Sequence, residues 1–346
     1  MTVKLDFAEV SRHFAPGWFA AVMGTGALAL TSLHFSQTIP FLSPFAWGLH
    51  YFNFAFFVLL ALPWLTRWLA HPDAVQQTLR HPVQAHFYPT FSIALLILAA
   101  QCNAFSMSVN LALTLWWSGT LLTYGFSFLV LYHVFRGEQV GMDHVTPGMY
   151  IPPVGLVVIP MAGAPLLPFQ VDAVRELALL FNYLGLGAGI GMYVSFLALN
   201  LFRFVLHKPV QGMLTPTLWI QLAPVGVIIV SLLNLVEQTP LIVNRDVFHV
   251  LALLLWGFGF WWLVMCLLLT SAVKRGGQLP FALSWWAFTF PLGAFVAAGI
   301  RLSVVMQIGL LHAVSLAAYV LLVVFWSITF YKTLRGALSG QLFKAH

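Results

Sequence analysis

Long apolar stretches separated by short polar segments dominate the chain. Ten of these stretches approach the length of about 20 residues that spans the hydrocarbon core of a bilayer. They run approximately over 16–35, 45–69, 86–106, 111–135, 149–166, 177–202, 215–236, 248–271, 281–302 and 308–331. The connections are short, so we expect antiparallel hairpins and a single transmembrane domain over 1–346, with short terminal tails and no soluble domain.

Composition supports a membrane protein and excludes a soluble one. Hydrophobic residues make up 61% of the chain and charged residues only 7%, against about 25% charged residues in ordinary soluble domains. The net charge of +6 does not indicate nucleic-acid binding, because the basic residues are scattered among the loops. The bilayer is therefore the expected surrounding of most side chains.

The basic residues fix an orientation for the ten spans. Twelve of the 15 lysines and arginines fall at the two termini or in the loops that follow even-numbered spans. They are Lys4, Arg12, Arg67, Arg80, Arg136, Arg203, Lys208, Lys274, Arg275, Lys332, Arg335 and Lys344. Because positive loops stay on the cytoplasmic side, we expect a multi-pass protein of the cell (inner) membrane with both termini cytoplasmic.

Proline recurs in or near the first half of every odd-numbered span. The positions are Pro16, Pro89, Pro152 with Pro153, Pro216 with Pro224, and Pro291, at intervals of about 70 residues. Proline kinks a helix because it removes a hydrogen bond. The spacing predicts an all-α fold of five helical hairpins in a ring, with the odd spans inside; merely local bending is the alternative.

Small residues also accumulate in the odd spans. The first span contains Gly24, Thr25 and Gly26, and the ninth contains Gly293 and Ala294. Small side chains let helix backbones approach closely, or they leave a lumen open. The sequence alone does not decide between these two roles.

Two segments carry a resemblance to a known family. Residues 14–26 read FAPGWFAAVMGTG, and residues 285–291 in the ninth span read WWAFTFP. Both segments resemble the tellurite-resistance/dicarboxylate transporter family, which includes fungal malate permeases, sulfite efflux pumps and plant slow anion channels. Chain length and the five-hairpin repeat also agree. The resemblance implies a quasi-fivefold ring around a central pore, and homotrimers in which every subunit has its own pore.

The resemblance also implies an aromatic gate. In channel members of the family a phenylalanine of the ninth helix closes the pore, and the matching position is Phe290, just before Pro291. Phe288 is the weaker candidate, because two residues correspond to about 200° around a helix and only one of the pair faces the axis. The expected pore-lining and kink positions are Pro16, Gly24, Thr25, Gly26, Pro89, Pro153, Pro216, Pro224, Thr289 and Pro291.

The centre of the expected pore lacks fixed charge, since no lysine or arginine lies at the middle of an odd span. Weak binding suits conduction, because a buried cation would hold an anion too tightly. Polar candidates for the lining are Thr25, Ser92, Thr217, Gln221 and Thr289, each of which could instead bond to its own helix backbone. Glu237 and Arg301 are expected to reach the membrane interface from the ends of their spans.

The expected function is the passage of small inorganic or organic anions across the membrane through a phenylalanine-gated channel. The alternative is a secondary transporter or exporter of C4-dicarboxylates such as malate, of sulfite or of tellurite-type oxyanions. We expect no enzyme, cofactor or metal site, because no catalytic or ligand cluster appears. His71, His81 and His86 lack the spacing of paired metal ligands and are expected to be solvated at the interface.

Overall fold

The ten predicted spans are all present. The computed structural model describes residues 6–137, 141–207, 212–240 and 242–343, and this part of the chain is helical without a strand. The spans are Pro16–Phe35, Leu42–Ala70, Gln84–Ala104, Val109–Arg136, Pro147–Phe169, Asp172–Leu206, Gly212–Gln238, Asp246–Arg275, Leu283–Val305 and Gly309–Leu338. The sixth span differs most from its prediction, because the polar residues that flank its apolar core continue the helix at both ends.

Each odd-numbered span starts as a 3₁₀ helix and continues as an α-helix. The pairs are η1 (Pro16–Phe19) with α2 (Ala20–Phe35), η2 (Gln84–Phe87) with α5 (Thr90–Ala104), η4 (Pro147–Tyr150) with α7 (Ile151–Gly163), η6 (Gly212–Gln221) with α9 (Leu222–Gln238), and η7 (Leu283–Phe288) with α11 (Phe290–Val305). The even spans are α3 (Leu42–Ala70), α6 (Val109–Arg136), α8 (Asp172–Leu206), α10 (Asp246–Arg275) and α12 (Gly309–Leu338). The shorter helices α1 (Phe7–Arg12), α4 (Pro72–Arg80), η3 (Met142–His144) and η8 (Gln341–Phe343) lie between the spans or near the termini, and η5 (Ala164–Phe169) ends the fifth span.

The recurrent prolines lie close to these junctions. Pro16 is the first residue of η1, Pro89 caps α5, and Pro291 is the second residue of α11. Pro153 and Pro224 lie in the first turns of α7 and α9, and Pro216 lies within η6. In the first turn of an α-helix proline removes no intrahelical hydrogen bond, so most of these prolines begin the α-helical part of their span.

Burial separates the spans into two sets. In the odd spans 78 to 89% of the apolar window is buried inside the protein, whereas in the even spans the share is 28 to 33%. We call the odd spans the inner spans and the even spans the outer spans. Large apolar side chains such as Phe128, Leu254 and Val320 are exposed on the outer spans, where lipid chains would cover them.

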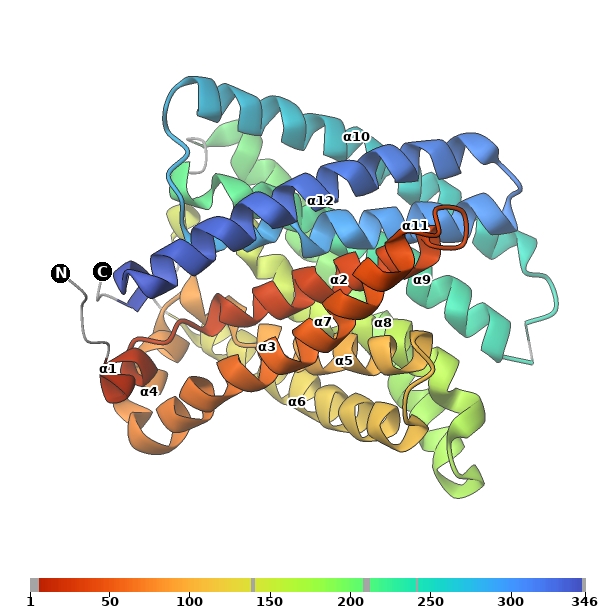
Figure 1. Cartoon of the computed structure of the whole chain (residues 1–346), viewed down its shortest axis with the longest axis horizontal. Coiled ribbons are helices and arrows are strands. Elements are labelled where there is room, and N and C mark those ends of the chain that lie inside the picture. Colours follow the sequence, from red (N-terminus) through yellow and green to blue (C-terminus); the bar gives the residue numbers. More distant parts are fainter. Residues whose placement is uncertain (1–5, 138–140, 208–211, 241, 344–346) are drawn as a thin grey trace.

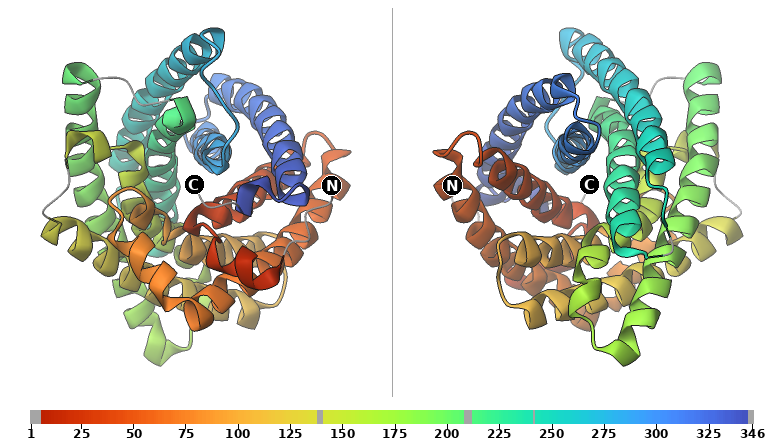
Figure 2. Two further views of the ribbon diagram at one scale, coloured as in Figure 1. Left: turned by 90° about the vertical axis from the view of Figure 1, so that its left-hand side faces the viewer. Right: turned by 90° about the vertical axis from the view of Figure 1, so that its right-hand side faces the viewer.

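The inner spans contact one another in a closed cycle. Helix α2 packs against α5, α5 against α7, α7 against α9, α9 against α11, and α11 against α2. Each also packs against the outer span that follows it in the chain. Figure 2 views the bundle from its two ends. This cyclic order is compatible with a ring of hairpins; fivefold symmetry about a central pore stays a prediction.

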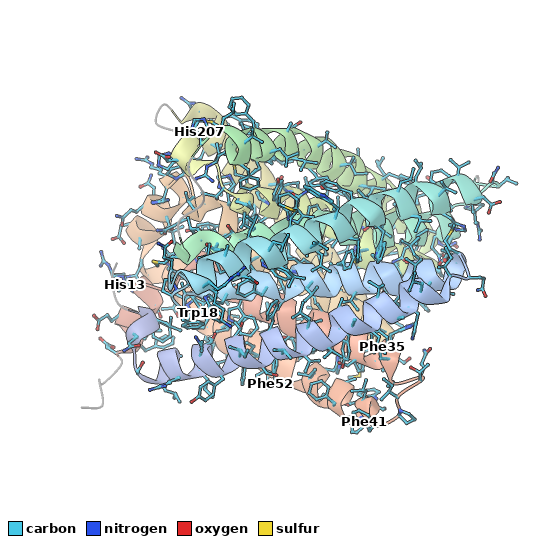
Figure 3. All side chains as sticks on the ribbon, turned by 90° about the horizontal axis from the view of Figure 1, so that it is seen from above. His13, Trp18, Phe35, Phe41, Phe52 and His207 are labelled. Atoms are coloured by element: carbon cyan, nitrogen blue, oxygen red, sulfur yellow. The ribbon has the colours of Figure 1, made fainter. Side chains whose placement is uncertain are left out.

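Both described ends of the chain lie at one end of the bundle. Helices α1 and α4 lie together there (Figure 1), joined by an ion pair of 2.7 Å between Arg12 and Asp73. The Trp18 and Phe343 rings stack with their centroids 5.5 Å apart. We call this the terminal end and the opposite one the remote end; His13 and His207 mark the first in Figure 3, and Phe41 marks the second. Lys4, Lys208 and Lys344 lie outside the described residues.

Candidate functional site

The contacts of α2 define which of its faces points into the bundle. The Thr25 hydroxyl accepts a hydrogen bond of 3.0 Å from Trp326 Nε1 on the outer helix α12. A methyl group added at Gly24 would overlap Thr289, which leads into α11, and one added at Gly26 would overlap Ile97 on α5. The remaining face of α2 points toward the middle of the inner spans. It carries Ala20, Met23, Ala27, Leu30 and His34.

The same reasoning places Phe290 on the inward face of α11. Phe295 stacks on Trp256 of α10, and a methyl group at Gly299 would overlap Ser315 of α12. Phe290 precedes Gly299 by nine residues, about two and a half helical turns, and so lies on the opposite side. This inner face carries Ala287, Phe290, Ala294, Ala297 and Arg301. Phe290 is the one bulky apolar side chain in that row, and it is 4% exposed.

Phe288 has different surroundings. Its ring lies 5.5 Å from that of Trp219 and 5.0 Å from that of Phe325, which belongs to the outer helix α12. The ring is buried in this aromatic cluster. Among the aromatic ring pairs of the described residues Phe290 has no partner. Phe288 thus packs toward α12, and the Phe290 ring does not join this cluster.

Helix α9 packs against α11 on one side and α7 on the other, which defines its inward face. Gly226 lies against the backbone of Ala294 on α11, and Ser231 donates a hydrogen bond of 2.6 Å to Val157 O on α7. The inner face between these contacts carries Ile220, Ala223, Val227, Val230 and Asn234. Val227, like Val158 of α7, is fully buried. At the level of these two valines the inner spans therefore pack closely together.

The glycines of the inner spans serve close packing. A methyl group at Gly24 or Gly26 would overlap a side chain of a neighbouring span, and one at Gly226 would overlap the Ala294 backbone. Gly293 lies against Ala27 in the same way. Of the two roles that the sequence left open, helix contact is the one these positions have.

The polar residues proposed for the lining are already engaged. Thr25 and Thr289 donate to the carbonyls of Ala21 and Trp286, at 2.8 and 2.7 Å. Thr217 donates to Leu214 O at 2.6 Å. Ser92 bonds to Thr123 on α6, and Gln221 donates to the Tyr193 hydroxyl on α8. These groups stabilise their own helix or anchor an outer span, so the inner faces around Phe290 are mainly apolar.

Two charged residues behave differently from the expectation. Arg301 donates a hydrogen bond of 2.6 Å to Glu237, which lies on the neighbouring inner helix. The two side chains are 34 and 41% exposed, and their bond bridges α9 and α11. The residues are 64 positions apart, and only a contact prediction would have found the pair. His86 also differs from expectation, because it is buried rather than solvated.

The family model for the voltage-dependent anion channel (SLAC1) matches residues 13–334, nearly the whole sequence. The chain belongs to the voltage-dependent anion channel family. This confirms the resemblance drawn from residues 14–26 and 285–291, and it covers both charged residues of the α9–α11 pair.

Relatives of the chain are transport proteins. An uncharacterized transporter of Methanocaldococcus jannaschii is 40% identical over 349 residues, covering 99% of this chain and 98% of its own. A sulfite efflux pump of Arthroderma benhamiae is 26% identical, with 85% of this chain and 82% of its own covered. A malic acid transport protein of Schizosaccharomyces pombe is 20% identical, with 96 and 80% covered. Membership of the anion channel family supports a multi-pass membrane protein that moves anions.

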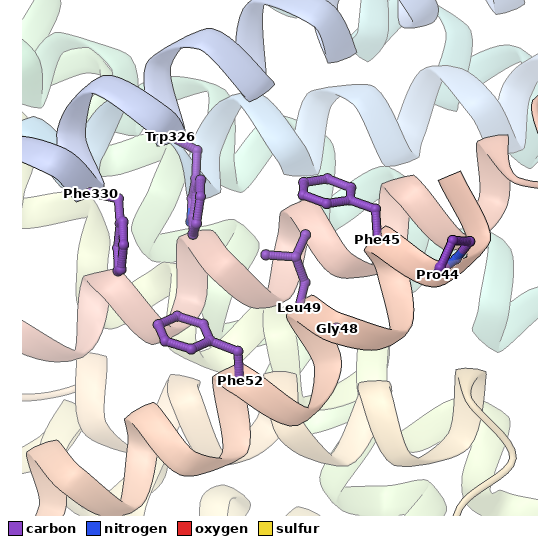
Figure 4. Close-up of a pocket in the computed structure, with 7 residues that line it drawn as sticks. All are labelled: Pro44, Phe45, Gly48, Leu49, Phe52, Trp326 and Phe330. Carbon is purple, nitrogen blue, oxygen red and sulfur yellow. The ribbon is translucent and has the colours of Figure 1, made fainter. Parts of the chain in front are cut away.

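An apolar groove lies on the outside of the bundle. It lies between α3 and α12 and is lined by Pro44, Phe45, Gly48, Leu49, Phe52, Trp326 and Phe330 (Figure 4). This lining is apolar and belongs to the outer spans. The groove therefore suits a lipid chain better than an anion.

Proposed function

We propose that the protein is a channel that passes small inorganic or organic anions between its five inner spans, with Phe290 as the gate. The observation that carries the proposal is the position of Phe290. Its ring is buried on the inward face of α11, in a row otherwise made of alanines and ending in Arg301. A single bulky ring among small side chains can close a passage, and its displacement can open one.

Electrostatics of the bundle favour anions at the terminal end. All five inner spans begin at that end, so their helix N-termini, which carry partial positive charge, point the same way. Arginines that end outer spans, such as Arg67 and Arg203, lie at the same end. The middle of the inner spans has no charged side chain. An anion would be attracted to the passage without being trapped inside it.

Purified protein in liposomes tests this proposal. We expect currents carried by chloride, nitrate or small carboxylates, with a reversal potential that follows the anion gradient and no dependence on a proton gradient. Cation-selective currents, or none with any anion of the panel, would overturn the proposed function.

A secondary transporter or exporter of C4-dicarboxylates, sulfite or related oxyanions is the second candidate. The names of the sulfite efflux pump and the malic acid transport protein among the relatives favour it. Flux that responds to a proton gradient and produces no channel-like current would support this candidate. The inner spans carry no carboxylate near their middle to take up a proton, which favours the channel.

We propose that the protein lies in the cell (inner) membrane with cytoplasmic termini and forms homotrimers. The small residues Gly187, Gly191 and Ser195 follow one exposed face of α8, where another helix can approach closely. Native mass spectrometry of the wild type and of Gly187→Leu tests the assembly. A trimer that the substitution weakens supports this contact, and a wild-type monomer contradicts it.

A further inference from the structure

Three inner faces end in polar side chains at the remote end of the bundle. His34 on α2, Asn234 on α9 and Arg301 on α11 each follow, by eleven residues, an inward-facing residue of the same helix. Eleven residues make about three turns, or roughly 16 Å along the axis. For Arg301 the earlier residue is Phe290, so Arg301 lies on the same face as the proposed gate. We call His34, Asn234, Glu237 and Arg301 the mouth cluster.

Hydrogen bonds tie the mouth cluster to three inner spans. Arg301 Nη2 donates to Glu237 Oε1 at 2.6 Å and to Asn234 Oδ1 at 3.4 Å. Asn234 Nδ2 donates in turn to Met161 O on α7 at 3.0 Å. The guanidinium is therefore held in place from α7 and α9. A fixed guanidinium loses little freedom when it binds a further partner.

Much of the donor capacity of Arg301 is unused. A guanidinium has five N–H groups and no acceptor, and the recorded bonds of Arg301 all use Nη2. Its Nε–H is enclosed and has no acceptor among the described residues. The side chain as a whole is 34% exposed. Arg301 can thus keep its bond to Glu237 and still offer N–H groups to an anion at the mouth.

The charges around the pair make Glu237 the carboxylate that neutralises Arg301. On α10, Asp246 lies 3.9 Å from His249, and on α8, Asp172 lies 3.4 Å from Arg175, so these described carboxylates have neighbours of their own. Loss of the Glu237 charge would leave the mouth cluster positive.

We infer that Arg301 binds the entering or leaving anion at the remote mouth, and that Glu237 weakens this binding so that the anion can depart. The ligand is a halide or a small oxyanion such as nitrate, sulfite or a carboxylate, all of which accept N–H bonds from a guanidinium. This inference rests on the proposed function. A channel must bind an ion strongly enough to admit it and weakly enough to release it. Arg301 would provide the binding, and Glu237 would keep it weak.

The test measures how anion flux into liposomes depends on nitrate concentration. Glu237→Gln removes the charge at constant shape, so the half-saturating nitrate concentration should fall about threefold, the order expected for one half-exposed ion pair. The maximal flux should fall as well, because release slows. Arg301→Gln should raise the half-saturating concentration by a similar factor.

Arg175→Gln is the matched control, because it removes one positive charge at the remote end but from the outer helix α8. It should leave the half-saturating concentration unchanged. A thermal unfolding measurement on each variant shows whether the protein is folded. If Arg301→Gln does not fold, Glu237→Gln, which keeps the side-chain shape, decides alone.

The outcomes separate the two proposals. Wild-type flux of nitrate with unchanged half-saturating concentrations in Glu237→Gln and Arg301→Gln overturns the mouth site and leaves the channel standing. An effect of Arg175→Gln as large as that of Arg301→Gln also overturns it, since only diffuse charge would then matter. Absence of wild-type anion flux overturns the proposed function and this inference with it.

Discussion

Phe288 and Phe290 are two residues apart, yet the structure gives them different neighbours. The sequence could indicate that only one of them faces inward, and the family resemblance pointed to Phe290. The residues that hold Phe288 in its position lie elsewhere in the chain. Trp219 and Phe325, which surround Phe288, come from the seventh and tenth spans, and a local pattern does not reveal such distant partners.

This difference predicts unequal losses of stability. Phe288→Ala leaves a cavity among packed aromatic rings and should lower the free energy of unfolding by about 3 kcal/mol. Phe290→Ala removes a ring that has no aromatic partner among the described residues, and it should cost clearly less. Thermal unfolding of the two variants in the same detergent checks this; an equal or larger loss for Phe290→Ala would contradict the assigned faces.

At the scale of elements, the glycines explain how closely the inner spans approach. The sequence showed that small residues accumulate in these spans, but it left packing and lumen lining equally open. The face on which a glycine lies depends on how the helix is rotated, and rotation is set by the neighbouring helices. Gly226 against the backbone of Ala294 is the clearest case, because a backbone cannot rotate away as a side chain can.

Gly226→Ala should therefore destabilise the protein by about 2 kcal/mol through overpacking between α9 and α11. Gly125→Ala is the control, since a methyl group at this exposed position of α6 meets nothing within 4 Å. The control should be neutral or slightly stabilising, because alanine favours a helix over glycine. Chemical or thermal unfolding measures both, and a tolerated Gly226→Ala would be at odds with the close approach.

At the scale of the whole molecule, the ten spans and their division into inner and outer sets were predictable. Bilayer thickness fixes the length of a span, and the recurrent prolines marked the odd spans. The bridge between Arg301 and Glu237 was not predictable, since it joins two spans through their relative position. Both residues appeared in the sequence as isolated charges near span ends, and packing brought them to 2.6 Å.

The topology predicts which loops are accessible from outside the cell. Val243, at the remote end, and Gln278, at the terminal end, are both exposed. The native Cys102 and Cys266 are buried, so single cysteines can be added without removing them. A membrane-impermeant thiol reagent on intact cells should label Val243→Cys and spare Gln278→Cys. The reverse pattern would place the termini outside, and labelling of both would contradict the hairpin order.

The Phe290 ring is proposed to close an anion passage between the inner spans. The most direct test compares the nitrate conductance of wild-type protein and Phe290→Ala in liposomes, at equal protein content and zero proton gradient. We predict that Phe290→Ala raises the conductance about tenfold, which requires the barrier to fall by only about 1.4 kcal/mol, with anion selectivity retained. A conductance equal to that of the wild type, or lower, in a folded Phe290→Ala protein would contradict a gate at Phe290.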